Sequence, residues 1–157
     1  MKIIGIDPGN LETAFVEIEP IVKEHTEINI LQYGILPNCE MLDLVRANID
    51  SDSVHAIEMI ASYGMPVGKT VFETCLMIGR IQEASKIPCH LVYRKDIKMA
   101  FCGNFRAKDA NIKQALTDRF GQQGTKLNPG RLYGIKKDMW SALAVAVYWW
   151  DIHLGIK

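Results

Sequence analysis

Residues 2–19 have the sequence KIIGIDPGNLETAFVEIE, which predicts how the fold begins. Apolar and β-branched residues lie on both sides of the turn-forming letters PGN, a pattern typical of two strands joined by a tight turn. A third stretch of this kind follows at residues 27–36. We therefore expect strands at residues 2–7, 13–19 and 27–36, paired in succession.

The rest of the chain alternates between helix and strand patterns. Apolar residues at helical spacing predict helices, and short apolar runs bounded by turn residues predict buried strands. The expected order is a helix at residues 39–48, a strand at 54–60, a helix at 67–86, a strand at 89–93, and helices at 106–120 and 137–153. This order predicts an α/β fold with a mixed five-stranded sheet and helices on both faces.

The composition predicts one domain over residues 1–157, because 48% of the residues are hydrophobic and the chain is long enough for one core. No apolar run approaches the roughly 18 residues that span a bilayer, and the N-terminus lacks the pattern of a secretion signal. The four cysteines form no CxxC pair, so we expect reduced thiols and no zinc site. These features indicate a cytoplasmic protein.

The net charge is zero, but the charges are unevenly distributed along the chain. Residues 1–93 carry six lysines and arginines against 13 acidic residues, whereas residues 94–137 carry 11 against three. A basic segment of this kind is typical of a surface that binds a polyanion such as DNA, provided that the fold gathers its cations on one face. An ordinary solvated helix face is the alternative.

Three carboxylates have positions that suggest chemistry when they are taken together. Asp7 closes the first strand, Glu58 lies in the apolar run at residues 54–60, and Asp138 opens the last helix. Each has an ordinary alternative: a turn-forming aspartate, an edge glutamate in solvent, and a helix N-cap worth about 1 kcal/mol. A buried glutamate, however, costs several kcal/mol unless a cation compensates for it.

Together these carboxylates predict a site for hard divalent cations, which prefer oxygen ligands. Two ions about 4 Å apart can stabilise both the attacking and the leaving oxygen of a phosphodiester displacement. We expect Mg²⁺, with Mn²⁺ able to replace it and two ions at each site.

Three segments resemble the RuvC-type Holliday-junction resolvases of the ribonuclease-H-like superfamily. They are IGIDPGNLET at residues 4–13, AIEMI at 56–60 and DMWSALAVAV at 138–147. The resemblance covers nearly the whole chain and implies that Asp7, Glu58 and Asp138 are catalytic metal ligands. It also implies a ribonuclease-H-like fold and hydrolysis of branched DNA that leaves a 5′-phosphate and a 3′-hydroxyl.

The family pattern places a fourth acidic ligand three residues after Asp138, where this chain has Ser141. A serine hydroxyl brings no charge, so Ser141 is a weaker candidate ligand and one ion is expected to depend more on substrate phosphate.

The resemblance also supplies DNA-binding candidates. In the segment at residues 97–112, Lys98 and Lys108 occupy the places of two family lysines that contact the cleaved strand. Lys98 is therefore also a catalytic candidate, and Arg106 joins the DNA-binding set. The family often has an aromatic residue three positions after Glu58, where this chain has Ala61, so Tyr63 is the candidate to stack on a base instead. Solvated surface lysines are the alternative for Lys98 and Lys108.

The implied function is a crossover-junction endodeoxyribonuclease, which acts on four-way (Holliday) and other branched DNA during recombination, repair or DNA processing. Paired cuts across a symmetric junction imply a homodimer, for which the helix at residues 67–86 is the expected interface. The expected setting is the cytoplasm of a bacterium or of a virus-infected bacterial host. The sequence leaves open whether a branch-migration motor is a partner.

Two alternatives remain open from the sequence. The missing acidic residue at Ser141 favours a branched-DNA-binding protein of the same fold without catalysis. The motif IGIDPGN also resembles the first phosphate loop of sugar kinases, actin and Hsp70. Those proteins close two such domains over a nucleotide, and 157 residues provide only one.

Overall fold

The structure, a computed structural model, describes residues 1–21, 27–62 and 64–155. The strands in these ranges are β1 (Lys2–Pro8), β2 (Glu12–Pro20), β3 (Ile28–Pro37), β4 (Ser53–Met59) and β5 (Cys89–Tyr93). The helices are α1 (Asn38–Ala47), α2 (Lys69–Ala84), α3 (Arg94–Cys102), α4 (Asp109–Phe120) and α5 (Met139–His153).

The strands form one sheet in the order β3-β2-β1-β4-β5. β2 pairs antiparallel with both β1 and β3, whereas β4 pairs parallel with both β1 and β5. This mixed five-stranded sheet confirms the predicted fold class. Because β1 and β4 run side by side in the same direction, their carboxyl ends meet at one edge of the sheet, which is the usual place for sites in such folds.

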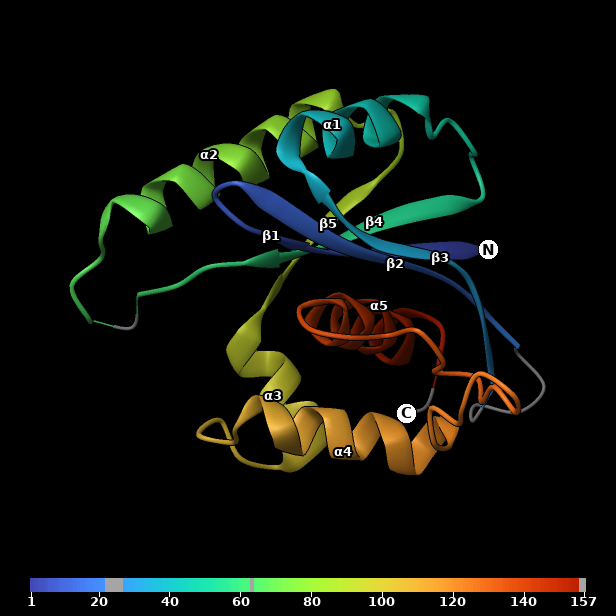
Figure 1. Cartoon of the computed structure of the whole chain (residues 1–157). Helices are drawn as coiled ribbons and strands as arrows, with labels where there is room; N and C mark the ends of the chain where they lie inside the picture. The colour runs from blue at the N-terminus through green and yellow to red at the C-terminus, as the bar shows by residue number, and fades with distance from the viewer. Residues whose placement is uncertain (22–26, 63, 156–157) are drawn as a thin grey trace.

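Helices cover both faces of the sheet (Figure 1): α1 and α2 lie on one face, and α5 lies on the other. The central strand β1 is therefore buried on both sides. Ile4 and Ile6 pack into the core beneath α1 and α2, whereas Ile3 packs into the core that α5 shares with the sheet. A strand buried on both faces is expected to be apolar almost throughout, as β1 is.

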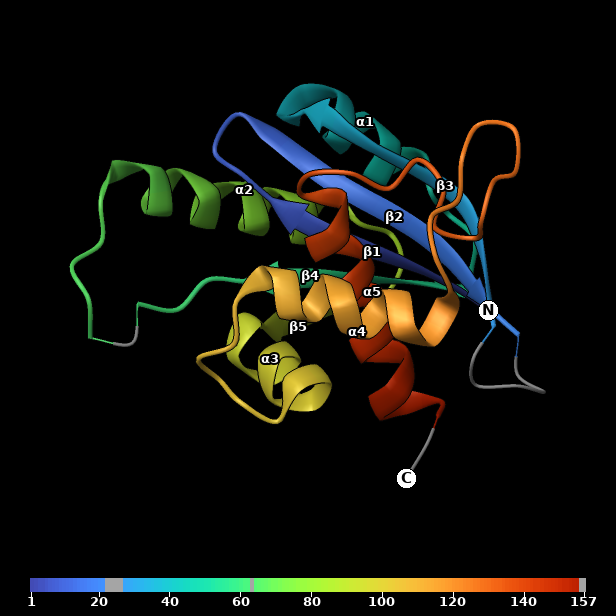
Figure 2. The same cartoon turned by 60° about the horizontal axis from the view of Figure 1, so that its bottom comes forward.

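Helix α5 is apolar around its whole circumference because it is covered on both sides. Figure 2 shows α4 lying across α5, away from the sheet. The ring of Trp150 in α5 stacks on that of Phe120 in α4, with centroids 6.5 Å apart. Arg119 of α4 donates two hydrogen bonds, of 2.7 and 2.8 Å, to the carboxylate of Asp151. In the described ranges no helix is both long and apolar enough to cross a bilayer.

The expected helix pattern was wrong at residues 94–108. Helix α3 begins directly after β5, and α4 begins at Asp109 rather than at residue 106. The pattern of α3 is weak because only Ile97 of its nine residues is buried. Its end does carry a sequence signal, since Gly103 follows in the left-handed conformation at φ 62°.

The backbone of α5 lies directly against β1 at Gly5. A Cβ at this position would lie 2.0 Å from the carbonyl oxygen of Ala142 and 2.8 Å from the Cβ of Ala146. Only glycine permits this approach, which brings the start of α5 close to the carboxyl edge of the sheet.

Replacing Gly5 by alanine is expected to destabilise the protein, because α5 must move away from the sheet. We expect a loss of about 1–3 kcal/mol in the free energy of unfolding, the range for an overpacked core. Gly79→Ala is the matched control. A Cβ at Gly79, inside α2, would meet no atom within 4 Å, so this variant should gain about 0.5–1 kcal/mol. Urea unfolding measures both, and a Gly5→Ala protein as stable as wild type would contradict the close approach.

Candidate functional site

Asp7 lies near the end of β1, just before a turn that other side chains fix. Thr13 Oγ1 donates a hydrogen bond of 2.8 Å to Asn38 Oδ1, and Asn38 Nδ2 donates one of 3.1 Å to the carbonyl oxygen of Gly9. A Cβ at Gly9 would lie 2.4 Å from the carbonyl oxygen of Glu12, so the turn requires glycine. Asp7 itself is part of the strand, and the residues after it make the turn.

Glu58 lies beside Asp7 on the neighbouring parallel strand. The pairing of β1 with β4 ends at Ile6 and Ile57, directly before these two residues, and the carboxylate of Glu58 is close enough to raise the pKa of Asp7. β4 lies between β1 and β5 rather than at an edge, and the Glu58 side chain is only 14% exposed. The alternative of an edge glutamate in solvent is therefore wrong.

Arg94 provides the nearest positive charge to Glu58, and the sequence did not single it out. Its Nη1 donates a hydrogen bond of 3.0 Å to Glu58 Oε2, and its Nη2 lies 2.7 Å from Asp109 Oδ1. Arg94 is the first residue of α3, directly after β5. A cation immediately after a strand beside β4 is a signal that could have pointed to this contact.

The start of α5 adds Asp138 and Ser141 to the same group. Asp138 occupies the N-cap position, but its side chain makes no capping hydrogen bond, so its carboxylate is not engaged in that role. Ser141 lies close enough to Asp7 to lower the pKa of that carboxyl slightly. Lys137, directly before Asp138, has a left-handed backbone with φ 50°, which a residue other than glycine rarely adopts and which is common at functional sites.

The positive charges nearby do not fully compensate for the negative charge of these acidic side chains. Burial, followed by the nearby carboxylate of Glu58, raises the pKa of Asp7 to about 7, although Arg94 acts in the opposite direction. Asp138 raises the pKa of Asp7 further. Burial also raises the pKa of Glu58, against the lowering effect of Arg94. Buried carboxylates of this kind become fully ionised most readily when a further cation is present.

The oxygen atoms of the acidic group are of the kind that a hard divalent cation prefers, but they are not arranged closely enough to enclose one. Asp7, Glu58 and Asp138 offer carboxylate oxygens and Ser141 offers a hydroxyl, which are the ligand types that Mg²⁺ and Mn²⁺ prefer. In the part of the chain that the structure describes, no three acidic, histidine or cysteine side chains are close enough to hold a metal ion by themselves. The assignment of metal ligands therefore stays a prediction, and Arg94 is the group bound to Glu58.

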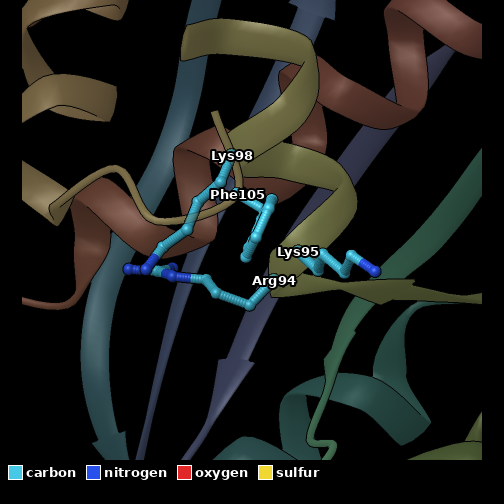
Figure 3. A pocket seen from close by; sticks show the side chains of 4 residues that line it. All are labelled: Arg94, Lys95, Lys98 and Phe105. Atoms are coloured by element: carbon cyan, nitrogen blue, oxygen red, sulfur yellow. The ribbon is translucent and has the colours of Figure 1, made fainter. Parts of the chain in front are cut away.

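Lys98 lies in α3, on the same side of the site as Arg94. Its charge acts on Glu58 and lowers the pKa of that carboxyl. Arg94, Lys95, Lys98 and Phe105 line a cavity of about 360 Å³ (Figure 3). Lys98 is thus close enough to affect Glu58, and the role on the substrate that the family resemblance implies for it stays a prediction.

Two further DNA-binding candidates, Arg106 and Lys108, lie in the segment that connects α3 to α4. Arg106 lies in the segment between α3 and α4, with its guanidinium 5.4 Å from the centre of the Phe105 ring. Lys108 occupies the N-cap position of α4, where its backbone N–H donates to Asn111 Oδ1 at 2.9 Å. Tyr63 lies outside the described residues.

A second cavity, of about 190 Å³, borders the site at the start of α5 and is lined by both lysines and aspartates. Lys113 and Lys137 line it together with Asp138 and Ser141. The Nζ of Lys113 lies 4.9 Å from the centre of the Trp140 ring. Sequence reasoning missed both lysines as site residues. The fold thus brings cations from α3, α4 and the segment before α5 around the acidic group.

Comparisons with known proteins find the fold but no related sequence. No protein-family model and no curated protein matches the chain. Among solved structures, RuvC of Thermus thermophilus superposes with a TM-score of 0.67 at 16% identity, covering 94% of this chain and 92% of that one. The same protein in complex with a Holliday junction substrate gives a TM-score of 0.65 at 13% identity, with the same coverage.

A resolvase from another organism also has a similar fold at low sequence identity. The yeast mitochondrial Holliday junction resolvase Ydc2 superposes with a TM-score of 0.60 at 10% identity, covering 94% of this chain and 78% of that one. At such low identities the likeness concerns the fold. The chain therefore has the ribonuclease-H-like fold of the RuvC-type Holliday junction resolvases.

Proposed function

We propose that this protein is a metal-dependent endonuclease that hydrolyses phosphodiesters in four-way and other branched DNA. The observation that carries the proposal is the pair of partly buried, neighbouring carboxylates, Asp7 and Glu58, with Asp138 and Ser141 near Asp7 at the start of α5. The likeness in fold to junction resolvases supports the same substrate class.

Asp7, Glu58, Asp138 and the hydroxyl of Ser141 would hold Mg²⁺ or Mn²⁺ in this proposal. Such ions, two to a site, lower the pKa of bound water and stabilise the charge on the attacking and leaving oxygens of a phosphodiester. Because Ser141 brings no charge, one of the two ion positions depends more on oxygens of the DNA phosphate.

Arg94 and Lys98 have complementary roles toward the DNA. Arg94 neutralises Glu58 while the site is without a cation, and so it competes with any cation for that carboxylate. A guanidinium binds phosphate in a forked geometry, so Arg94 can exchange the Glu58 carboxylate for a DNA phosphate. Lys98, a point charge beside the same carboxylate, stabilises negative charge on the cleaved phosphate. Arg106, Lys108 and Tyr63 complete the proposed DNA contacts.

The protein acts as a homodimer in this proposal, with α2 at the interface. Phe72 and Leu76 are 59% and 69% exposed and lie one turn apart on α2, so they form an apolar strip on its outer side. Met65 and Val67 extend the apolar surface before the helix. A two-fold dimer matches the symmetry of a four-way junction and allows paired cuts. The proposed setting is DNA recombination, repair or processing in the cytoplasm of a bacterium or of a virus-infected bacterial host.

A non-catalytic branched-DNA-binding protein is the second candidate. Two observations favour it: Ser141 stands where the family pattern has an acidic residue, and Glu58 already has a partner in Arg94. Binding of a four-way junction without any cleavage in Mg²⁺ or Mn²⁺ would select this candidate.

Asp7→Asn should abolish metal-dependent nicking of a synthetic four-way junction. Loss of one central carboxylate removes several kcal/mol of transition-state stabilisation, so we expect a fall of about 100-fold or more in the cleavage rate. Junction affinity, measured by gel shift in EDTA, should stay close to that of wild type. Asp43→Asn is the matched control, since Asp43 is an exposed aspartate on α1 that pairs with Arg46. Wild-type rates in Asp7→Asn would exclude this site.

Arg94→Gln should strengthen metal binding and weaken cleavage. Without its guanidinium, Glu58 is free for a cation, and calorimetry should show Mn²⁺ binding about five-fold tighter, roughly the 1 kcal/mol of a partly exposed ion pair. Cleavage should fall despite the tighter binding, because a phosphate contact is lost. Arg46→Gln, which breaks an exposed pair with Asp43 on α1, is the control. If Arg94→Gln left Mn²⁺ affinity unchanged, competition for Glu58 would be disproved.

Leu76→Glu should convert the dimer into monomers without unfolding it, because this side chain is exposed on α2 in the single chain. A charge on each side of a two-fold interface faces its own copy, and like charges in an apolar contact are costly. Sedimentation should show a dimer for wild type and a monomer for the variant. Ile49→Glu, 68% exposed before β4, is the control and should remain dimeric. A wild-type monomer at micromolar concentration would rule out the dimer.

A further inference from the structure

Phe105 is a large apolar side chain displayed in a basic environment. It is 51% exposed and lies between α3 and α4. The segment around it is fixed by a local turn: Asn104 Oδ1 accepts a hydrogen bond of 2.9 Å from the backbone N–H of Arg106, and the Asn104 carbonyl accepts one of 3.0 Å from Ala107. The ring itself is half exposed and belongs to neither hydrophobic core.

Cations surround the ring. The Nζ of Lys95 lies 5.7 Å from the ring centre, and the guanidinium carbon of Arg106 lies 5.4 Å from it. Both distances are within the range of cation–π attraction, which keeps the ring in place. Figure 3 shows the ring of Phe105 between Lys98 and Lys95, with Lys95 extending away from Lys98 and Arg94. The surface at Phe105 thus combines an aromatic ring with positively charged side chains.

The cavity beside Phe105 leads to the acidic group. Its other lining residues are Arg94, Lys95 and Lys98, and both Arg94 and Lys98 act on Glu58. At about 360 Å³ it is large enough for one nucleobase with its sugar. A ligand that fits this lining has a flat aromatic face and carries negative charge, a combination that a nucleotide supplies.

We propose that Phe105 stacks on one unpaired nucleotide of the DNA, and that the cavity formed with Arg94, Lys95 and Lys98 holds this nucleotide beside the cleavage site. Bases within an undistorted duplex are covered on both faces by their neighbours, so a single exposed ring stacks most readily on a base that is unpaired or at a helix end. Branch points and single-stranded segments supply such bases. This inference rests on the proposed function and names the residue by which the site distinguishes branched from fully paired DNA.

The test uses the full-length chain in Ca²⁺ or EDTA with a four-way junction carrying 2-aminopurine at the branch point, and a matched duplex. Stacking quenches 2-aminopurine fluorescence, and titrations give both affinities. Phe105→Leu keeps the apolar bulk without an aromatic face, whereas Phe105→Trp restores one. Ile49→Ala, an exposed apolar residue before β4 and far along the sheet from the site, is the matched control.

We expect Phe105→Leu to lose the quenching and to weaken junction binding roughly 5- to 150-fold, the range for removal of one base–aromatic stack. Duplex binding should change by less than about two-fold, because phosphate contacts dominate it. Phe105→Trp should restore junction affinity and quenching. The inference is overturned if Phe105→Leu binds the junction as wild type does, or if junction and duplex affinity fall together.

Cleavage assays in Mg²⁺ and Mn²⁺ on the same preparations separate this inference from the nuclease proposal. If wild type cuts junctions and Phe105→Leu retains full preference and quenching, only the stacking role fails. If wild type prefers junctions through Phe105 but never cuts them, the nuclease proposal fails and the stacking role stands. If wild type shows no preference for branched DNA, both fail.

Discussion

The site depends on two partly buried carboxylates that the sheet holds close together in a poorly solvated position. Asp7 and Glu58 lie side by side because β1 and β4 are parallel neighbours in fixed register. Moving either side chain to the other face would require a one-residue slip of a strand that is buried on both sides. The chain therefore keeps two carboxyl groups in a poorly solvated position, where the pKa of each is raised, with the carboxylate of Asp138 nearby. Such an arrangement costs stability unless positive charge compensates for it.

Two sources of positive charge are available to this acidic group. Within the chain, the guanidinium of Arg94 bridges Glu58 and Asp109. From outside, a divalent cation suits the same oxygen ligands. In the proposed function a cation at Glu58 would compete with the guanidinium of Arg94 for the same carboxylate, so cation binding would be coupled to the position of an arginine next to Lys98. That coupling connects metal binding to the surface that would receive the DNA backbone.

Much of the fold could be predicted from the sequence, because its strongest signals are local. The strand endings at Asp7 and Glu58 follow from apolar runs and turn residues, and the parallel pairing of their strands brings them together. The contacts of Arg94 could not be predicted in this way. They depend on α3, a helix with a single buried residue, and on where that helix starts relative to β4. The cavity at Phe105 likewise depends on how α3 and α4 are placed around their connecting segment. Patterns of apolar residues do not encode such placements.

In the proposed function the carboxylates of Asp7 and Glu58 bind a divalent ion. Anomalous X-ray scattering from a crystal grown with Mn²⁺ tests this most directly. We predict a manganese peak shared by the carboxylates of Asp7 and Glu58, close to Asp138 and Ser141, with Arg94 turned away from Glu58. A map without manganese at this edge of the sheet, with the Arg94–Glu58 pair intact at millimolar Mn²⁺, would contradict the account.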